Sequence, residues 1–169
     1  MPFWSKLVES IRKRDSLLCV GLDPHPGQLP AGCGSVRAFM QNIVEQTADV
    51  ACAFKPNIAF YEALGPDGLV ELQEIMAAIP EDIPVILDAK RNDISSTATA
   101  YARSVFERWG VDAVTVNPYL GRDGVEPFLA YEERGVFVLC KTSNPSASEV
   151  QDWSQGGEPL YRHVARLVD

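Results

Sequence analysis

Short apolar segments alternate with segments of helical character along this chain, and this alternation limits the fold more than any other feature. The apolar segments have the length of buried strands, and they are residues 17–23, 51–58, 83–90, 112–117 and 135–141. The segments expected to be helical, several with apolar residues at helical spacing, are residues 35–49, 67–79, 95–109, 124–134 and 157–169. Ser35 is the expected N-cap of the first helix. Such alternation predicts βαβ units and a parallel sheet with right-handed crossovers.

The placement of polar residues favours a closed barrel over an open doubly wound sheet. Each strand segment is apolar for most of its length and polar at its carboxyl end. These polar residues are Asp23, Lys55, Asp88 with Lys90, Asn117, and residues 141–143. Barrel enzymes place their chemistry on that rim, whereas an open sheet concentrates it at one switch point. We therefore expect an α/β fold of the (β/α)₈ TIM-barrel class, as a single domain over residues 1–169 that covers about the first five βα units.

Charge and composition exclude several classes of protein. With 15 Lys+Arg against 23 Asp+Glu, the net charge is −8, so no net positive field attracts nucleic acid. No apolar run approaches the roughly 20 residues that span a bilayer, and the first residues do not resemble a signal peptide. The 4 cysteines form no C-x-x-C pair, so we expect free thiols in a reducing cytoplasm. Only 2 histidines are present, far apart, and we expect no metal site.

One strand segment carries a dense pattern of charge, LDAKRND. In a regular strand Asp88 and Lys90 share a face, about 6.5 Å apart along the chain. Two charges on an inward face persist more easily where each partly neutralises the other. Asp93 lies just beyond the strand end and Lys55 on the preceding strand, which predicts an alternating row Lys55–Asp88–Lys90–Asp93. The pattern alone fits a structural salt-bridge cluster as well as an active site, and Asp23 on a neighbouring strand end favours a site.

The same segment, LDAKRNDI followed by Thr97, resembles the signature of the orotidine 5′-monophosphate decarboxylase family, D-x-K-x-x-D-I with a nearby Thr. Three further segments match in order: CVGLDPHP around Asp23, FKPNIAFYE around Lys55 and VLCKTSNPSASEVQD around Ser143. NPYLGRDG fits as well, and the KPNIAFYE and TSNP segments resemble the bacterial longer (type 2) subgroup. The resemblance covers essentially the whole chain. Asn92 stands where Gly is common in that subgroup, a departure that we treat as tolerated.

The resemblance implies a cofactor-free decarboxylation of orotidine 5′-monophosphate to uridine 5′-monophosphate, a step of de novo pyrimidine biosynthesis. Asp88 resembles the carboxylate placed against the carboxylate of the substrate. Lys90 resembles the ammonium that stabilises the carbanion left at C6 and protonates it. Lys55 and Asp93 resemble the flanking members of the charged row, which also hold ribose hydroxyls. No cofactor and no metal are implied.

The resemblance also implies substrate-binding residues and a partner subunit. Asp23 resembles a ribose-hydroxyl ligand, and Ser143 the residue that reads the pyrimidine edge. Apart from the resemblance, Asn117 either contacts the ligand or only caps the strand end before Pro118, and we favour a supporting role. The family is a homodimer in which residues of one subunit reach the site of the other. Those residues correspond here to Asp93, Ile94 and Thr97.

Other interpretations stay open at this point. Magnesium-dependent sugar-phosphate decarboxylases and aldolases of the same superfamily also carry D-x-K-x-x-D, although the KPN and TSNP segments speak against them. A Schiff-base aldolase is a weaker rival. The third interpretation is an inactive fragment or non-catalytic remnant, since a closed barrel typically needs about 250 residues. On that interpretation strands six to eight, with the phosphate-binding Gln and Arg of the family, are missing, and we expect a poorly folded chain with exposed edges on the first and fifth strands.

We expect Lys90→Ala to abolish turnover of orotidine 5′-monophosphate while nucleotide binding stays measurable. The ammonium stabilises charge that develops only as CO₂ leaves, so its loss affects the transition state more than the bound substrate. Turnover is followed by the loss of orotidylate absorbance. Near-normal turnover in this variant would overturn the role assigned to Lys90.

Overall fold

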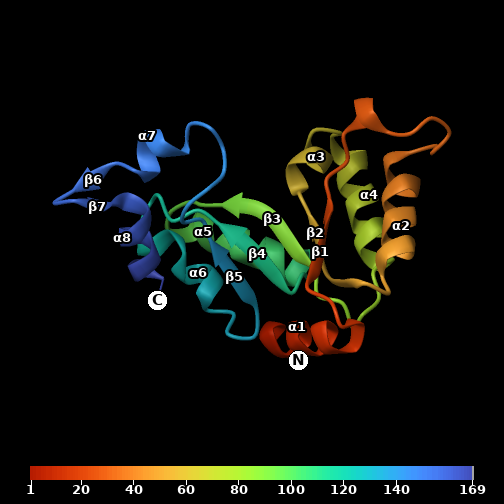
Figure 1. Cartoon of the computed structure of the whole chain (residues 1–169), viewed down its shortest axis with the longest axis horizontal. Helices are drawn as coiled ribbons and strands as arrows, with labels where there is room; N and C mark the ends of the chain where they lie inside the picture. Colours follow the sequence, from red (N-terminus) through yellow and green to blue (C-terminus); the bar gives the residue numbers. More distant parts are fainter. Residues whose placement is uncertain (169) are drawn as a thin grey trace.

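The computed structural model describes residues 1–168 and confirms the alternation of strands and helices (Figure 1). The parallel strands are β1 (Leu18–Leu22), β2 (Ala51–Pro56), β3 (Ile86–Arg91), β4 (Ala113–Val116) and β5 (Gly135–Val138). The α-helices are α1 (Phe3–Arg14), α2 (Val36–Thr47), α3 (Ile58–Glu62), α4 (Pro66–Ala77), α5 (Ser95–Arg103), α6 (Glu126–Leu129), α7 (Ala147–Gln151) and α8 (Leu160–Leu167). Shorter elements are the 3₁₀ turns η1 (Pro26–Gln28) and η3 (Arg122–Gly124), the π turn η2 (Ser104–Arg108), and the hairpin strands β6 (Ser154–Gln155) and β7 (Glu158–Pro159).

The five parallel strands are neighbours in the order in which they occur along the chain. β1 pairs with β2, β3 pairs with β4, and β4 pairs with β5. Two parallel bridges, Phe54 to Val85 and Asn57 to Asp88, join β2 to β3. This order has no reversal, as in a barrel, whereas a doubly wound sheet reverses at its switch point. All carboxyl ends of these strands therefore lie at one edge, the upper one in Figure 1.

The outer edges of this sheet are unpaired, as the sequence predicts. Within residues 1–168, β1 pairs with β2 alone and β5 with β4 alone. Leu18 on β1 is 47% exposed and Phe137 on β5 is 36% exposed. None of the helices in this part of the chain has both the length and the apolar character needed to cross a bilayer.

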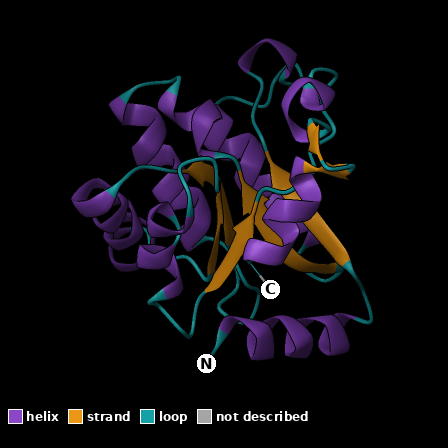
Figure 2. Cartoon of the chain, turned by 90° about the vertical axis from the view of Figure 1, so that its left-hand side faces the viewer, coloured by secondary structure: helices purple, strands orange, loops and turns teal. Residues whose placement is uncertain are grey.

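Helices surround the strands and form the core with them (Figure 2). The core joins apolar residues of four strands to apolar residues of the helices packed outside them. It includes Leu22, Phe54, Leu87 and Val114 from the strands, and Val44, Leu72, Val105 and Phe128 from the helical side. Removal of this apolar surface from water, at about 25 cal/mol per Å², is the main stabilising contribution of the fold. The polar carboxyl ends of the strands remain outside this core.

Helix α1 lies across the amino ends of the strands, and the sequence predictions did not include it (Figure 1). Phe3 is 1% exposed and packs against residues of three strands, Cys52, Ala53, Ile86 and Ala113. The Lys6 ammonium lies 3.0 and 2.9 Å from the two carboxylate oxygens of Asp112. Leu7 and Ile11 also pack on this cluster, so the spacing of Phe3, Leu7 and Ile11 was a detectable helical signal.

Two predicted boundaries differ from the structure because of Pro and Gly residues. β3 begins at Ile86 instead of residue 83, since Pro84 has no N–H for a strand ladder. The last helix begins at Leu160 instead of residue 157. Gly156 (φ 61°) and Gly157 (φ 85°) form the two-residue turn between β6 and β7, where positive φ at both positions suits a hairpin.

Two predicted helices are shorter or less regular than expected, and the N-cap of a third is confirmed. The segment 95–109 is α5 continued by the π turn η2, and the segment 124–134 contains only the end of η3 and α6. After α6, hydrogen bonds to residues distant in sequence stabilise the irregular segment. Arg134 Nη1 donates to Val111 O at 3.0 Å. Tyr131 Oη donates to Glu107 Oε1 at 2.7 Å. Ser35 Oγ accepts from the Ala38 amide at 3.1 Å, as the N-cap prediction requires.

We expect Gly135→Ala to destabilise the protein by about 1–3 kcal/mol, because α1 packs directly on this glycine. A Cβ at residue 135 would collide with the Phe3 ring and lie 2.7 Å from the Cβ of Ala113. Urea unfolding measures the change. Gly27→Ala is the matched control, since nothing lies within 4 Å of the Cβ that it adds. Equal free energies of unfolding for the two variants would contradict this account of α1.

We expect Asp82 to stabilise the fold at neutral pH and to lose this effect in acid. Hydrogen bonds from Lys13 Nζ at 2.8 Å and Arg14 Nη2 at 2.9 Å lower the pKa of Asp82 from 3.8 to about 2. The folded state binds this proton less readily than the unfolded state, so stabilisation is complete above about pH 4 and falls as the pH drops through about 2. The carboxylate is 43% exposed, so the effect is at most about 1 kcal/mol.

Urea unfolding of Asp82→Asn and of the unchanged protein at pH 7 and pH 2.5 measures this dependence. The difference in unfolding free energy between Asp82→Asn and the unchanged protein is expected to be smaller at pH 2.5 than at pH 7. Asp49→Asn serves as the control, because Asp49 makes no ion pair or side-chain hydrogen bond within residues 1–168. A difference for Asp82→Asn that is the same at both pH values would rule out the ion pair as its cause.

Candidate active site

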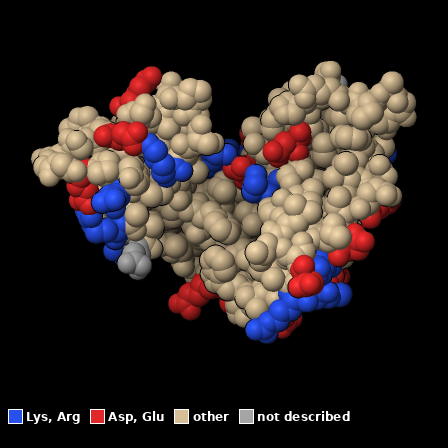
Figure 3. Space-filling model, in the orientation of Figure 1, with Lys and Arg blue, Asp and Glu red and all other residues tan. Residues whose placement is uncertain are grey.

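The carboxyl ends of β2 and β3 bring charged side chains together at the upper edge of the sheet. Figure 3 shows the molecule hollowed between two lobes, with basic and acidic side chains side by side at the upper margin of the hollow. Lys55 comes from β2, and Asp88 and Lys90 come from β3. Adjacent parallel strands end at one edge, which is why residues distant in sequence converge here.

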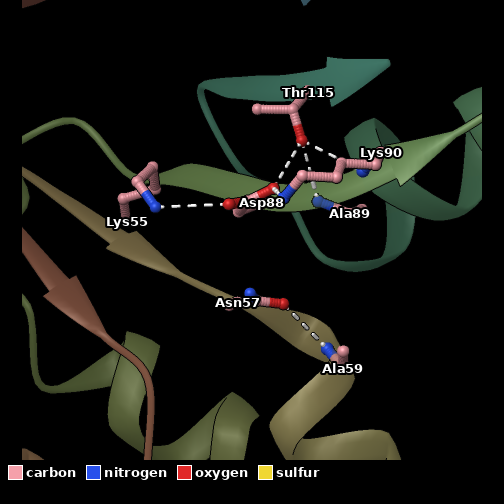
Figure 4. A network of polar contacts seen from close by, with 7 residues as sticks. All are labelled: Lys55, Asn57, Ala59, Asp88, Ala89, Lys90 and Thr115. Atoms are coloured by element: carbon pink, nitrogen blue, oxygen red, sulfur yellow. Dashed lines mark hydrogen bonds and ion pairs between the residues drawn. The ribbon is translucent and has the colours of Figure 1, made fainter. Parts of the chain in front are cut away.

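Asp88 is the centre of this cluster (Figure 4). It is 8% exposed, and three side chains donate to its carboxylate. Oδ1 accepts from Lys90 Nζ at 2.7 Å and from Thr115 Oγ1 at 2.8 Å. Oδ2 accepts from Lys55 Nζ at 3.3 Å. The structure therefore brings Lys55, Asp88 and Lys90 together as the sequence predicts.

Opposing influences act on the acidity of Asp88. Burial is the largest single one and raises the pKa of Asp88. Hydrogen bonds from Lys90 and Thr115, with the positive charges of Lys55 and Lys90, lower that pKa and together outweigh burial, so it lies below its ordinary value. Asp88 is thus an ionised acceptor at neutral pH, and its two ammonium partners leave the cluster with a net positive charge.

The backbone of β3 is irregular at this point, where the sequence predicts a regular strand. The pairing with β4 shifts register between Leu87 and Arg91, and Lys90 has φ 47°. The Lys90 side chain is 49% exposed, whereas that of Asp88 is 11% exposed, so the two do not share a single buried face. The prediction of regular alternation is wrong, because β3 has two more residues than β4 between these paired positions, so part of β3 has no ladder partner on β4. The ammonium still folds back to the carboxylate.

Asp93 does not join the cluster within the described residues. Its Oδ1 accepts from the adjacent Ile94 amide at 2.8 Å, at the start of α5. Ile94 and Thr97 lie exposed on the first turn of that helix. The structure therefore contains three members of the expected four-residue row, Lys55–Asp88–Lys90.

Among residues 1–168, the remaining predicted residues make no hydrogen bond or ion pair with Lys55, Asp88 or Lys90. Asp23 follows β1, and its Oδ1 is buried with no hydrogen-bond partner among residues 1–168. Asn117 follows β4, where its Oδ1 accepts from the Tyr119 amide at 2.9 Å and its carbonyl accepts from the Asn92 side chain. Ser143 is exposed in the loop between β5 and α7. Within the described residues, 1–168, no three His, Cys, Asp or Glu side chains lie close enough together to hold a metal ion.

One residue of the cluster, Thr115, was missed, and so was Asn57, whose backbone lies beside it. Thr115 on β4 contacts Asp88 directly. Asn57 pairs with Asp88 through a backbone bridge and caps α3, since its Oδ1 accepts from the Ala59 amide at 3.2 Å (Figure 4). Thr115 stands two positions before Asn117, so strand alternation placed both on one face and could have identified it.

Comparison with known sequences identifies a family and relatives that extend beyond this chain. Residues 16–169 match the model of the family described as orotidine 5′-phosphate decarboxylase / HUMPS family. The chain is 51% identical to orotidine 5′-phosphate decarboxylase of Thermomicrobium roseum, over 98% of the chain and 61% of that protein. It is 50% identical to the Azoarcus protein of the same name, over 99% of the chain and 64% of that protein. The chain thus spans less than two thirds of the length of these curated relatives.

Solved structures agree with the fold. A putative orotidine-monophosphate-decarboxylase from Toxoplasma gondii is 48% identical and superposes with a TM-score of 0.93, over 98% of this chain and 58% of that one. Leishmania donovani OMP decarboxylase is 43% identical with a TM-score of 0.88, over 98% of this chain and 64% of that one. This likeness confirms the barrel class for the part of a barrel that the chain covers.

Proposed function

Because the chain belongs to the orotidine 5′-phosphate decarboxylase / HUMPS family, we propose that it supplies the charged part of an active site that converts orotidine 5′-monophosphate to uridine 5′-monophosphate. The observation that carries the proposal is the Lys55–Asp88–Lys90 cluster at the carboxyl edge of the strands. The names of relatives that are 51% and 50% identical support it. The reaction would serve de novo pyrimidine biosynthesis.

The chemistry requires a fixed cation beside the carbon that loses CO₂. When the C6–carboxylate bond breaks, its electron pair stays on C6, and no adjacent carbonyl delocalises that pair. The Lys90 ammonium would stabilise the developing carbanion and then transfer a proton from Nζ to C6, leaving a neutral amine. A preorganised charge of this kind lowers the barrier because it acts where charge develops. We propose no cofactor for this step.

Asp88 and Lys55 would prepare the site for that step. Asp88 holds the Lys90 ammonium at 2.7 Å, which fixes the proton donor before substrate binds. The ionised Asp88 would also lie against the carboxylate of the substrate, and that repulsion is relieved as CO₂ leaves. Lys55 contacts the other oxygen of Asp88 and would offer its remaining donors to the ribose hydroxyls.

Further residues would bind the nucleotide or complete a partner's site. Asp23 carries a buried, unpartnered Oδ1 among the described residues, which a ribose hydroxyl would satisfy. Ser143 would face the pyrimidine, and Asn117 would have a supporting role. We also propose a cytoplasmic homodimer, in which residues at the exposed start of α5 reach the site of the partner subunit. These residues are Asp93, Ile94 and Thr97.

We expect orotidine 5′-monophosphate to be decarboxylated by a protein that contains this chain, without added metal. Loss of orotidylate absorbance and appearance of uridine 5′-monophosphate measure the reaction. The assay uses the 169-residue chain and the same chain completed with the carboxyl-terminal residues of the Thermomicrobium roseum relative. Lys13→Ala, on α1 at the opposite end of the strands, is the control for Lys90→Ala and should leave turnover unchanged.

Three results would contradict the proposed function. One is a folded, completed protein that binds orotidine 5′-monophosphate without turnover. The second is activity that a chelator abolishes and magnesium restores, which would favour a sugar-phosphate decarboxylase or aldolase. The third is a borohydride-trapped adduct with a sugar phosphate, which would favour a Schiff-base aldolase.

A further inference from the structure

We infer that Thr115 is a positioning residue, whose single hydroxyl sets the orientation of the Asp88 carboxylate and holds the break in β3 that carries Lys90. Thr115 lies on β4 with its hydroxyl toward β3, beside Asp88 and Lys90 (Figure 4). The kinetic consequence of this inference rests on the proposed decarboxylase function. The structural part concerns the geometry of β3 and β4 alone.

The contacts of the Thr115 hydroxyl use its whole hydrogen-bonding capacity. Oγ1 accepts from the backbone amides of Ala89 and Lys90, each at 3.0 Å. It also lies 2.8 Å from Asp88 Oδ1. A hydroxyl has two acceptor lone pairs and one proton. Because the amides occupy both lone pairs and an ionised carboxylate can only accept, the proton must point to Asp88.

The two amides need this acceptor because β3 leaves its ladder with β4. Ile86 and Leu87 pair with consecutive residues of β4, and the next paired residue of β3 is Arg91. Between them, Lys90 takes φ 47°, a conformation that is uncommon outside glycine and persists only where contacts hold it. The Thr115 hydroxyl replaces the missing carbonyl acceptor. It thereby stabilises the backbone conformation of Lys90 from which the ammonium reaches the Asp88 carboxylate.

The same hydroxyl determines which carboxylate oxygen meets which lysine. Oδ1 of Asp88 accepts from Lys90 and Thr115, and Oδ2 accepts from Lys55. Lysine side chains are long and flexible, so two ammonium groups alone leave the carboxylate free to rotate. The β-branched Thr115, on a paired strand, provides a donor of restricted position. The hydrogen bond also favours the ionised form of Asp88, in agreement with the direction of its pKa.

The test compares Thr115→Val with Thr115→Ser. Valine keeps the shape and removes the hydroxyl, and serine restores the hydroxyl without the methyl group. With Val we expect the pKa of Asp88, followed by carboxyl ¹³C NMR, to rise toward its ordinary value, and with Ser to return. In the completed protein we expect kcat to fall by roughly 10- to 100-fold with Val, with little change in KM, and to recover with Ser. Thr47→Val is the matched control, because that hydroxyl donates to the Ile43 carbonyl in α2.

The NMR measurements separate failure of this inference from failure of the proposed function, since they do not depend on catalysis. An unchanged pKa of Asp88 in Thr115→Val, or no return with Thr115→Ser, would overturn the inference whatever the enzyme does. If Thr115→Val does not fold, the inference is tested by the hydrogen-exchange rates of the Ala89 and Lys90 amides in the unchanged protein and in Thr115→Ser. Slow exchange of the Ala89 and Lys90 amides in both supports the inference, and exchange as fast as in an exposed loop overturns it.

Discussion

The burial of the Asp88 carboxylate is the constraint on which the carboxyl edge of this structure depends. A carboxylate removed from water is expensive unless its oxygens are paired. Here the donors come from three strands: Lys55 from β2, Lys90 from β3 and Thr115 from β4. They converge only if these strands are parallel and adjacent in this order. The charge balance around Asp88 therefore depends on the strand order of the barrel.

A second carboxylate organises the opposite edge of the sheet in a comparable way. Asp112, just before β4, accepts two bonds from Lys6 of α1. Its Oδ2 also accepts from the Val85 amide at 2.8 Å, just before β3. Side chains of the β4 segment thus hold β3 at both ends, Asp112 at the amino end and Thr115 at the carboxyl end. Between them, buried apolar side chains fill the core, so Asp88 and Asp112 lie at the two ends of the strands, where donors are available.

The break in β3 interrupts regular strand pairing at the position of Lys90. A continuous ladder would satisfy the amides of Ala89 and Lys90 through backbone carbonyls. The observed break leaves these amides to a side chain and holds Lys90 at positive φ. Strained positions of this kind are maintained by their surroundings and are concentrated at functional sites. Lys90, to which we assign the proton transfer in the proposed function, stands at this position.

The sequence by itself determined the periodicity of the elements and the chemical character of the strand ends. The parallel strands, the Ser35 cap and the pairing of Asp88 with Lys55 and Lys90 follow from patterns that are local or repeat along the chain. Only the tertiary structure decided the break in β3, the contacts of Thr115 and the separation of Asp93 from the cluster. Asp93 is turned to the amide of its neighbour Ile94. The break and the contacts of Thr115 depend on how β3 and β4 pair across some 26 residues of chain, as the Thr115–Ala89 bond does, and local propensity carries no information about that register.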